Sequence, residues 1–331
     1  MFCPRLDHFT RLNQNGTVGK CGHMITDKGF NSHEELENSD WLKNIKKMMR
    51  EDQWPDECVR CQQSEKTKGE SIRTNSIDRH RLLKKTRSDY LIVGGVLDNI
   101  CNSACQSCNA GLSTKIGSLS STQYPRVDNY ELFKAFPQER IVELDVNGGE
   151  PTASKNYKRI LNHLPRNIKI VRMNTNGSKM IKEIEQILQK GIMVIVTMSL
   201  DGIGKVHDYA RWPIKWSDYQ NTVYAYKGLQ AKHRLLHLDF WTTVSCLNIA
   251  DLQNIQKFAR DNQTPHDWAF LKKPDVLNVE HKNRFTDSAK SLYPQDVAIG
   301  SNNEDELNEF IARQDRLRGI DVRDYFNFFP K

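Results

Sequence analysis

The sequence lacks long apolar runs. No uninterrupted stretch approaches the ~18 apolar residues that a membrane-spanning helix requires, and hydrophobic residues make up 38% of the 331 residues. The opening residues, MFCPRLDHFTRL, lack the apolar core of a secretory signal peptide. These absences argue against a membrane protein and predict a cytoplasmic one. The length suffices for a barrel-sized core and a smaller unit.

Strong charge of one sign is also missing. The formal net charge of +7 is small for a chain of this length. Such a surface can attract an anionic partner, but it more often serves solubility. No segment resembles a dedicated RNA-binding module, and no appended peptide-recognition domain is evident. Nucleic acid is therefore not the expected partner.

Cysteine is the residue type that the sequence uses in an unusual way. The chain has eight cysteines, and in a reducing compartment they favour metal ligands or redox chemistry over disulfides. The motif CNSACQSC holds Cys101, Cys105 and Cys108, and no fourth cysteine follows nearby. Cys246 stands alone in the apolar stretch FWTTVSCLNI, which predicts a packed core thiol.

Four more cysteines lie in residues 1–65, which we interpret as a small cysteine-rich module. A hairpin is predicted over 9–21, where Asn15 and Gly16 suit a tight turn. Apolar residues at helical spacing predict a helix over 39–51. The four thiols could converge on one tetrahedral site, a pattern equally typical of structural zinc; they are Cys3, Cys21, Cys58 and Cys61. Residues 66–88 are polar and basic, and are predicted to form a connector.

Short apolar strands alternate with amphipathic helices from Asp89 onward. This alternation predicts parallel β/α units, with strands over 90–97, 141–147, 168–174, 192–200, 237–245 and 266–272. Helices are predicted over 156–164, 180–190, 219–232 and 251–262. Six units are too few for a full eight-fold barrel. The predicted fold is therefore α/β, with a partial (β/α)6 TIM-type barrel over 89–280.

Chemistry in such barrels lies on the loops that leave the carboxyl-terminal ends of the strands. The motifs CNSACQSC, NGGEP, NTNG and SLDG all follow predicted strands, so we expect them on one edge. Residues 281–331 are predicted as a helical and aromatic tail. In that tail, Phe310, Ile311 and Leu317 are expected to pack against the barrel, and the final aromatic residues to close its open side or base.

Three cysteines without a fourth suit a cubane iron–sulfur cluster with one open iron. Each iron of a 4Fe–4S cluster takes one external ligand, so three thiolates leave one iron free to bind a small molecule, as a catalytic zinc keeps one open position. Two alternatives remain on spacing alone. One is an incidental buried triplet, and the other is a zinc knuckle that borrows a remote histidine such as His207.

CxxxCxxC after a first strand and GGEP after the second resemble the radical S-adenosylmethionine (radical SAM) superfamily. The N-terminal elements, CP at Cys3, the hairpin to Cys21 and CVRC, resemble the auxiliary module of its SPASM/twitch branch. In most relatives that module follows the barrel, whereas here it precedes it. The resemblance implies that Cys101, Cys105 and Cys108 hold a 4Fe–4S cluster whose open iron binds SAM. It also implies that an electron from the cluster cleaves SAM to methionine and a 5′-deoxyadenosyl radical, which abstracts a substrate hydrogen.

The resemblance also implies which residues contact SAM. The GGEP residues would receive its amino group, the third-strand motif would lie near the ribose, a hydroxyl and a guanidinium would hold the carboxylate, and the fifth strand would line the adenine. In that order they are Gly148, Gly149, Glu150 and Pro151; Asn174 and Thr175; Ser199 and Arg211; and Ser245 and Leu247. The plainer interpretations are a surface position for Glu150, an Arg211–Asp208 ion pair and core packing for Leu247. Relatives usually carry an aromatic residue where this chain has Ser107, so the adenine contact there is open.

For the N-terminal cysteines the resemblance implies an auxiliary iron–sulfur cluster, 4Fe–4S, with zinc as the alternative. Four cysteine ligands leave no open iron, which favours electron transfer over substrate ligation. The expected partners are a reductant such as flavodoxin or ferredoxin and a peptide, protein or small-metabolite substrate. Two alternatives remain: a radical SAM enzyme acting on tRNA or a nucleotide, and a non-enzymatic zinc protein contacting nucleic acid. No catalytic acid or base is assigned.

Overall fold

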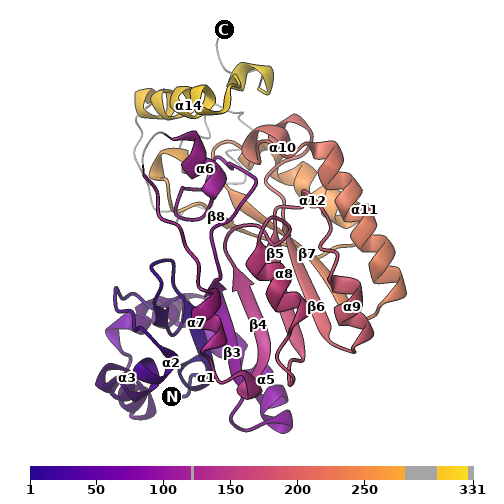
Figure 1. Cartoon of the computed structure of the whole chain (residues 1–331). Helices are drawn as coiled ribbons and strands as arrows, with labels where there is room; N and C mark the ends of the chain where they lie inside the picture. Colours follow the sequence, from indigo (N-terminus) through magenta and orange to yellow (C-terminus); the bar gives the residue numbers. More distant parts are fainter. Residues whose placement is uncertain (121–122, 280–303, 327–331) are drawn as a thin grey trace.

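The computed structural model of the chain describes residues 1–120, 123–279 and 304–326 (Figure 1). An eight-stranded, mostly parallel sheet forms its centre, in the order β2-β1-β3-β4-β5-β6-β7-β8. The six strands predicted from alternation are all present and pair in parallel. They are β3 Leu91–Val96, β4 Ile141–Asn147, β5 Ile170–Thr175, β6 Met193–Ser199, β7 Leu236–Val244 and β8 His266–Phe270.

Two further strands extend the sheet beyond the six that were predicted. The hairpin expected over 9–21 is confirmed as β1 Phe9–Leu12 and β2 Val18–Gly19, paired antiparallel. What the sequence did not indicate is that β1 also pairs in parallel with β3, from Phe9↔Ile92 to Leu12↔Gly95. The N-terminal hairpin is therefore the edge of the barrel sheet itself, and its Leu12 and Val18 belong to the main core.

One face of the sheet packs on helices and the other lines the inside of its curve. In β7 the side chains of Leu236, Leu238 and Phe240 are buried, while the alternate residues His237 and Trp241 are exposed. This period-two alternation is typical of a strand with one face in the core. Figure 1 shows α8, α9, α11 and α12 on the outer side.

The predicted helices form, with shifted ends. The helix expected over 180–190 is shorter, at Ile184–Gln189, and the connector expected over 66–88 contains the end of α4 and the whole of α5. The α-helices are α1 Pro4–His8, α2 His33–Asn38, α3 Asp40–Arg50, α4 Val59–Lys68, α5 Ile72–Thr86, α6 Thr114–Leu119, α7 Tyr130–Lys134, α8 Lys155–Asn162, α9 Ile184–Gln189, α10 Lys205–Ala210, α11 Trp216–Lys232, α12 Leu252–Asp261 and α14 Glu304–Arg318. Single 3-10 turns lie at Asp56–Cys58, Gln138–Arg140, Ile249–Asp251, Asp275–Leu277 and Val322–Asp324.

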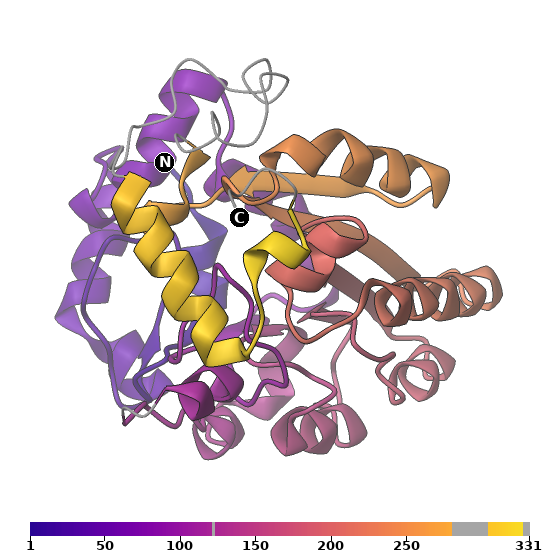
Figure 2. The ribbon, with the colours of Figure 1, turned by 90° about the horizontal axis from the view of Figure 1, so that it is seen from above.

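The tail helix α14 lies beyond the carboxyl-terminal ends of the strands (Figure 1) and crosses over them when seen from above (Figure 2). Ile311 is buried and Phe310 partly buried against this part of the core, as predicted. The prediction for Leu317 is wrong, because its side chain is 36% exposed; Leu307 on the apolar side of α14 is buried instead. The last aromatic residues, Phe328 and Phe329, lie outside the described residues.

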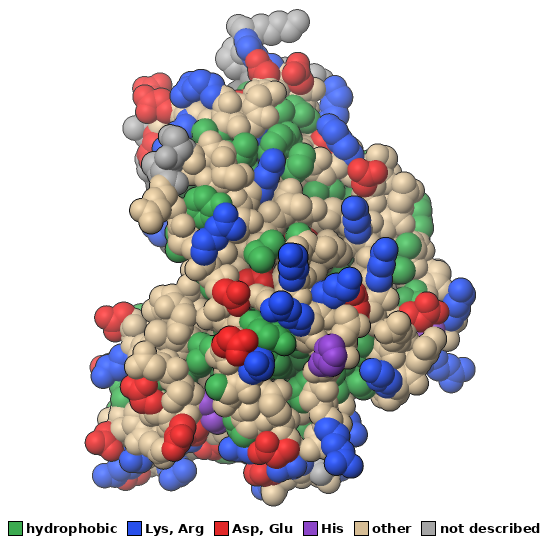
Figure 3. All heavy atoms as spheres, in the orientation of Figure 1, with side chains coloured by type: hydrophobic (Ala, Val, Ile, Leu, Met, Phe, Trp, Pro, Cys, Tyr) green, Lys and Arg blue, Asp and Glu red, His purple; other side chains and the backbone are tan. Residues whose placement is uncertain are grey.

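Lys and Arg side chains gather over the middle of the face that carries α8, with acidic side chains toward its margins (Figure 3). Within the described residues, none of the helices combines the length and the hydropathy that spanning a membrane would take.

Candidate functional site

The four sequence motifs lie at one edge of the sheet, as predicted. Each follows a strand that runs parallel to its neighbours, so the carboxyl-terminal ends of these strands meet at the same side. CNSACQSC follows β3, NGGEP follows β4, NTNG follows β5 and SLDG follows β6. The candidate site is built from these loops.

Two of the three cysteines of CNSACQSC, Cys101 and Cys105, contact Ser103, and Cys108 joins them through its backbone. The Ser103 hydroxyl lies 3.3 Å from Cys101 Sγ and 3.6 Å from Cys105 Sγ, and the Cys108 amide donates to the Cys105 carbonyl at 3.2 Å. Burial first, and then the charge of Cys105, raise the pKa of Cys101, and the same two causes raise the pKa of Cys108 to about 12. Thiolates held this close repel one another unless a cationic group binds them, so the donor set suits a metal cluster.

Within residues 1–120, 123–279 and 304–326, no three Cys, His, Asp or Glu side chains are arranged to hold a single metal ion. The remote histidine considered for a zinc knuckle, His207, lies against the rings of Trp216 and Tyr219, at 5.4 and 4.6 Å between centroids. Burial and the nearby Arg211 charge lower the pKa of His207 to about 3. In this position it is a neutral core side chain. Cys246 is buried in a core cluster with Tyr209 and Leu277, as predicted.

The backbone of the cysteine loop is fixed by residues far away in the sequence. The Ala104 amide donates to the Trp212 carbonyl at 2.7 Å. Arg318, from the end of α14, donates from Nε to the Ala104 carbonyl at 2.9 Å and from Nη2 to the Cys105 carbonyl at 3.4 Å. Arg318 is buried, and its charge interacts with Cys105 and Cys108. Sequence reasoning missed this contact, and no local pattern around Arg318 indicates it.

Arg211 lies beside the cysteines, held by Asp201. Its Nη1 donates to Asp201 Oδ2 at 3.0 Å, and Asp201 Oδ1 accepts from the Thr243 amide at 2.9 Å. Burial lowers the pKa of Arg211, but the negative charges of Cys105 and Asp201 outweigh burial and raise it. The alternative ion pair with Asp208 is wrong, because Asp208 accepts from the Trp216 amide at 2.6 Å instead. Arg211 Nε is buried without a partner among the described residues, so one donor remains for a ligand.

The GGEP loop can approach the cysteine loop only because two residues lack a Cβ. Gly148 and Gly149 have φ of +84° and +59°, a region that costs other residues about 1–2 kcal/mol. A Cβ on Gly149 would lie 2.5 Å from the Ile100 carbonyl oxygen. That oxygen accepts the Glu150 amide at 2.7 Å. The two loops are thus joined by their backbones directly before Cys101.

Alanine at position 149 is therefore expected to destabilise the fold by about 2–4 kcal/mol, from positive φ and overpacking against immovable backbone. Gly191 provides the matched control, because its φ is +75° but nothing lies within 4 Å of its added Cβ. Gly191→Ala should cost only the conformational part, about 1–2 kcal/mol. Urea unfolding midpoints of the two variants measure the difference. Equal midpoints would show that the GGEP loop moves freely away from the cysteine loop.

The carboxylate of Glu150 joins the loops after β4 and β5. It is fully buried and accepts hydrogen bonds from Thr175 Oγ1 at 2.9 Å, the Asn176 amide at 2.7 Å and Thr152 Oγ1 at 2.9 Å. Burial nevertheless raises its pKa. The surface position considered for Glu150 is wrong. Asn176 continues the network by donating to Asn102 Oδ1 at 2.8 Å.

The other residues suggested for SAM contact lie along the same edge. Asn174 is exposed and Ser199 is half-buried, at the ends of β5 and β6. Ser245 is buried after β7. Pro151 is buried within the GGEP loop, and Leu247 is 3% exposed in the core cluster with Tyr209 and Ile311. Asn176 was expected here as part of the NTNG motif, whereas the role of Asp201, which holds Arg211, was not foreseen from its place in SLDG.

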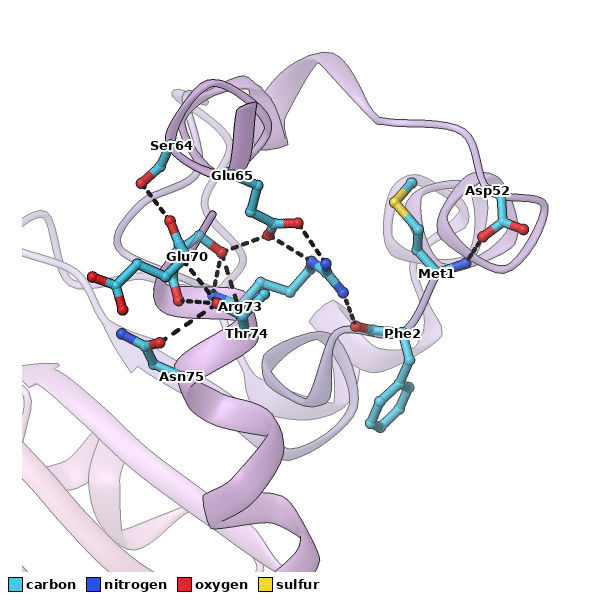
Figure 4. Close-up of polar contacts among 10 residues, drawn as sticks. Met1, Phe2, Asp52, Ser64, Glu65, Glu70, Arg73, Thr74 and Asn75 are labelled. Atoms are coloured by element: carbon cyan, nitrogen blue, oxygen red, sulfur yellow. Dashed lines mark hydrogen bonds and ion pairs between the residues drawn. The ribbon is translucent and has the colours of Figure 1, made fainter. Parts of the chain in front are cut away.

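The four N-terminal cysteines line one small apolar pocket together with Trp54 and Met49. Burial first, and then the charges of the other cysteines, raise the pKa of Cys3 to about 11 and that of Cys58 to about 12. Arg73 on α5 fixes the chain end beside Cys3. It donates to the Phe2 carbonyl at 2.7 Å and to Glu65 Oε1 at 2.9 Å (Figure 4). The structure thus brings Cys3 and Cys21 to the CVRC pair, of which Cys58 ends a 3-10 turn and Cys61 lies in the first turn of α4.

No protein-family model and no curated protein matches the chain. Among solved structures it is similar to Streptococcus suis SuiB bound to the precursor peptide SuiA, at 12% identity and a TM-score of 0.43, over 96% of this chain and 70% of that one. SuiB bound to S-adenosylmethionine gives 12% identity and a TM-score of 0.42, over 94% and 70%. Native anSMEcpe with bound AdoMet and Kp18Cys peptide is 15% identical, with a TM-score of 0.42, and the match covers 69% of this chain and 62% of that one. At these values we take no residue assignment from them.

Proposed function

We propose that the chain is a radical SAM enzyme of the SPASM/twitch type. It cleaves S-adenosylmethionine reductively and abstracts a hydrogen atom from a peptide, protein or small-metabolite substrate. The observation that carries this proposal is the grouping of Cys101, Cys105 and Cys108 in one loop, the first two in contact with Ser103, at the strand edge that also holds the GGEP loop and Arg211. Three soft thiolate donors with no fourth cysteine fit a 4Fe–4S cluster with one open iron.

The residues of the chain hold and orient the reactants. Cys101, Cys105 and Cys108 would ligate the cluster, and the open iron would take the amino and carboxylate groups of SAM. When bound, the cluster supplies the electron that cleaves SAM to methionine and a 5′-deoxyadenosyl radical. Arg211 offers its unpartnered Nε toward the carboxylate, with its fork held in place by Asp201.

Glu150 has a different role from the one first suggested by the motif. Because its two oxygens already accept bonds from the loops after β4 and β5, we assign it to holding the GGEP loop in place. The loop backbone at Gly148 and Gly149 then receives the SAM amino group. Asn174 and Thr175 would face the ribose, Ser199 the carboxylate, and Ser245 with Leu247 the adenine.

The apolar pocket of Cys3, Cys21, Cys58 and Cys61 suits an auxiliary iron–sulfur cluster, since four thiolates satisfy it completely. Such a cluster would pass electrons and leave substrate ligation to other groups. A flavodoxin or ferredoxin would supply the first electron. We place the enzyme in the cytoplasm, where these thiols stay reduced.

Metal analysis of anaerobically reconstituted protein, combined with a SAM cleavage assay, tests the proposal. About eight irons per chain, with 5′-deoxyadenosine released in the presence of SAM and dithionite, are expected. About four irons plus one zinc would keep the enzyme but remove the auxiliary electron path. Zinc alone, without cleavage, would overturn the proposal in favour of a zinc protein.

A further inference from the structure

A polar cavity of about 650 Å³ lies between the N-terminal hairpin and the ends of β3 and β4. Its volume falls in the usual range for ligand sites, about 300–1,000 Å³. It opens on the same strand edge as the candidate site, since Val96 and Asn147, the last residues of β3 and β4, line it. Gly22, next to Cys21, lines it from the other side. The cavity is therefore lined both by a neighbour of Cys21 and by the strand ends that precede CNSACQSC and NGGEP.

Charged side chains of both signs line this cavity without neutralising one another. Arg5, Arg11 and Asp145 are half-buried in its wall, while Asp27 and Lys28 are exposed at its mouth. None of these side chains takes part in an ion pair within the described part of the chain. By contrast, Arg73 and Glu65, two other half-buried charges, form an ion pair. Unpaired charges of both signs in the wall of a cavity are typical of a binding site for a polar ligand.

The strand register sets the spacing of the two opposite charges on the inner face. Arg11 pairs with Gly94, and Gly94 pairs with Asp145, so one residue without a side chain separates them. Two inter-strand spacings put their Cα atoms about 10 Å apart. The amide of Asn147 lies one layer above Asp145 on the same strand, directly before Gly148.

Arg5 and Arg11 are held so that their guanidinium groups keep a fixed direction. Arg5 lies 3.7 Å above the ring of Phe9, and its Nε has no partner among the described residues. Arg11 donates from Nε to Asn13 Oδ1 at 2.8 Å, which leaves its outer nitrogens for another acceptor. Two oriented guanidinium groups form a good carboxylate site, because each supplies charge-assisted hydrogen bonds.

We propose that this cavity is the substrate site and that it binds an acidic amino-acid unit, with the carboxylate on Arg5 and Arg11 and an N–H donor on Asp145. This assignment rests on the proposed radical SAM function for its chemical role, although the binding itself does not. The unit has two possible sources, a free acidic amino acid or a glutamate or aspartate within a peptide. Asn13 and Asn147 complement the amide groups of either.

Isothermal titration of the full-length, reconstituted protein without SAM tests the assignment. The probes are free L-glutamate and the capped tripeptide Ac-Ala-Glu-Ala-NH2, each with its glutamine counterpart. At least one glutamate probe is expected to bind tenfold or more tightly than its glutamine counterpart, because the carboxylate gains charge-assisted bonds. The probe that shows the preference identifies the source. Absence of a preference in both pairs would overturn the proposal.

Variants locate the binding site. Arg11→Gln is expected to abolish the preference for the glutamate probe over its glutamine counterpart. Asp145→Asn is expected to weaken the binding of both probes about tenfold. Arg166 is an exposed arginine that does not line the cavity, so Arg166→Gln should leave the affinities for both probes unchanged. A loss of affinity in Arg166→Gln as large as in the cavity variants would overturn the assignment. Iron content checks that Arg11→Gln retains the auxiliary cluster. If it does not, Asp145→Asn, in a strand away from the cysteines, must still weaken the binding of both probes for the proposal to stand.

The assay also separates this inference from the proposed function. Protein that cleaves SAM but binds neither glutamate probe in preference to glutamine would retain the enzyme class and refute the cavity assignment. Protein that prefers glutamate, loses this preference in Arg11→Gln and never cleaves SAM would retain the cavity assignment and refute the enzyme class.

Discussion

Cys105→Ala is expected to reduce 5′-deoxyadenosine formation from SAM to background, while Cys58→Ala retains a measurable part of it. Cys105 is the buried member of the triplet, and its charge is the largest of the effects that raise the pKa of Arg211. Like Cys101, it contacts Ser103. Its loss removes one of the three proposed cluster ligands. Cys58 belongs to the separate N-terminal pocket, whose proposed cluster passes electrons without binding SAM.

Cys246→Ala provides the control for the removal of a thiol as such. Cys246 is buried in the core cluster with Leu277 and Tyr209, so the variant should keep its full iron content and its SAM cleavage. Iron and sulfide per chain are measured beside cleavage for all three variants. Cleavage that persists in Cys105→Ala would refute the assignment of CNSACQSC.

The strands were predictable because each is a short apolar run between polar segments. β6, with the sequence MVIVTMS, is buried in its central residues Val194, Ile195 and Val196, so its composition alone indicates it. The edge that carries the site was predictable for a related reason. Parallel strands place their carboxyl-terminal ends together, and a motif directly after a strand must lie there.

The attachment of β1 to β3 was not predictable in the same way. The local sequence specifies the hairpin through Asn15 and Gly16, but not which strand its outer edge meets. That pairing depends on a backbone approach at Gly95, whose φ is +92° and whose added Cβ would lie 2.2 Å from the Leu12 carbonyl oxygen. Such a constraint joins residues more than 80 positions apart, as the Leu12↔Gly95 pair shows.

The tail shows the limit of periodicity as well. The apolar positions of α14 predicted a buried face, and Ile311 is on it, but Leu317 is exposed whereas Arg318 is buried. A charged residue is seldom buried unless its donors find acceptors. Here two carbonyl groups of the cysteine loop provide them, at a sequence separation of more than 200 residues. The buried arginine thus indicates that α14 belongs to the candidate site.

Arg318→Met is accordingly expected to lower the midpoint potential of the proposed SAM-binding cluster, on the order of 50 mV, which corresponds to about 1 kcal/mol for one electron. The buried guanidinium interacts favourably with Cys105 and Cys108, and a positive charge stabilises the reduced, more negative state. Arg318→Lys should keep the midpoint potential close to that of the unmodified protein, because the positive charge remains, but it should lose the two hydrogen bonds to the Ala104 and Cys105 carbonyls. A redox titration followed by electron paramagnetic resonance measures the shift.

The same residue has an effect that does not depend on any metal. Arg318 Nε and Nη2 hold the carbonyls of Ala104 and Cys105, so in metal-free protein both Arg318→Met and Arg318→Lys should increase amide hydrogen exchange across residues 101–108. Arg316→Met, an exposed neighbour on α14, should change neither exchange nor potential. A lowered potential with unchanged exchange would make Arg318 a purely electrostatic group. Increased exchange with an unchanged potential would make it a support for the loop, and only both changes together show that α14 positions the cysteines and sets their charge environment.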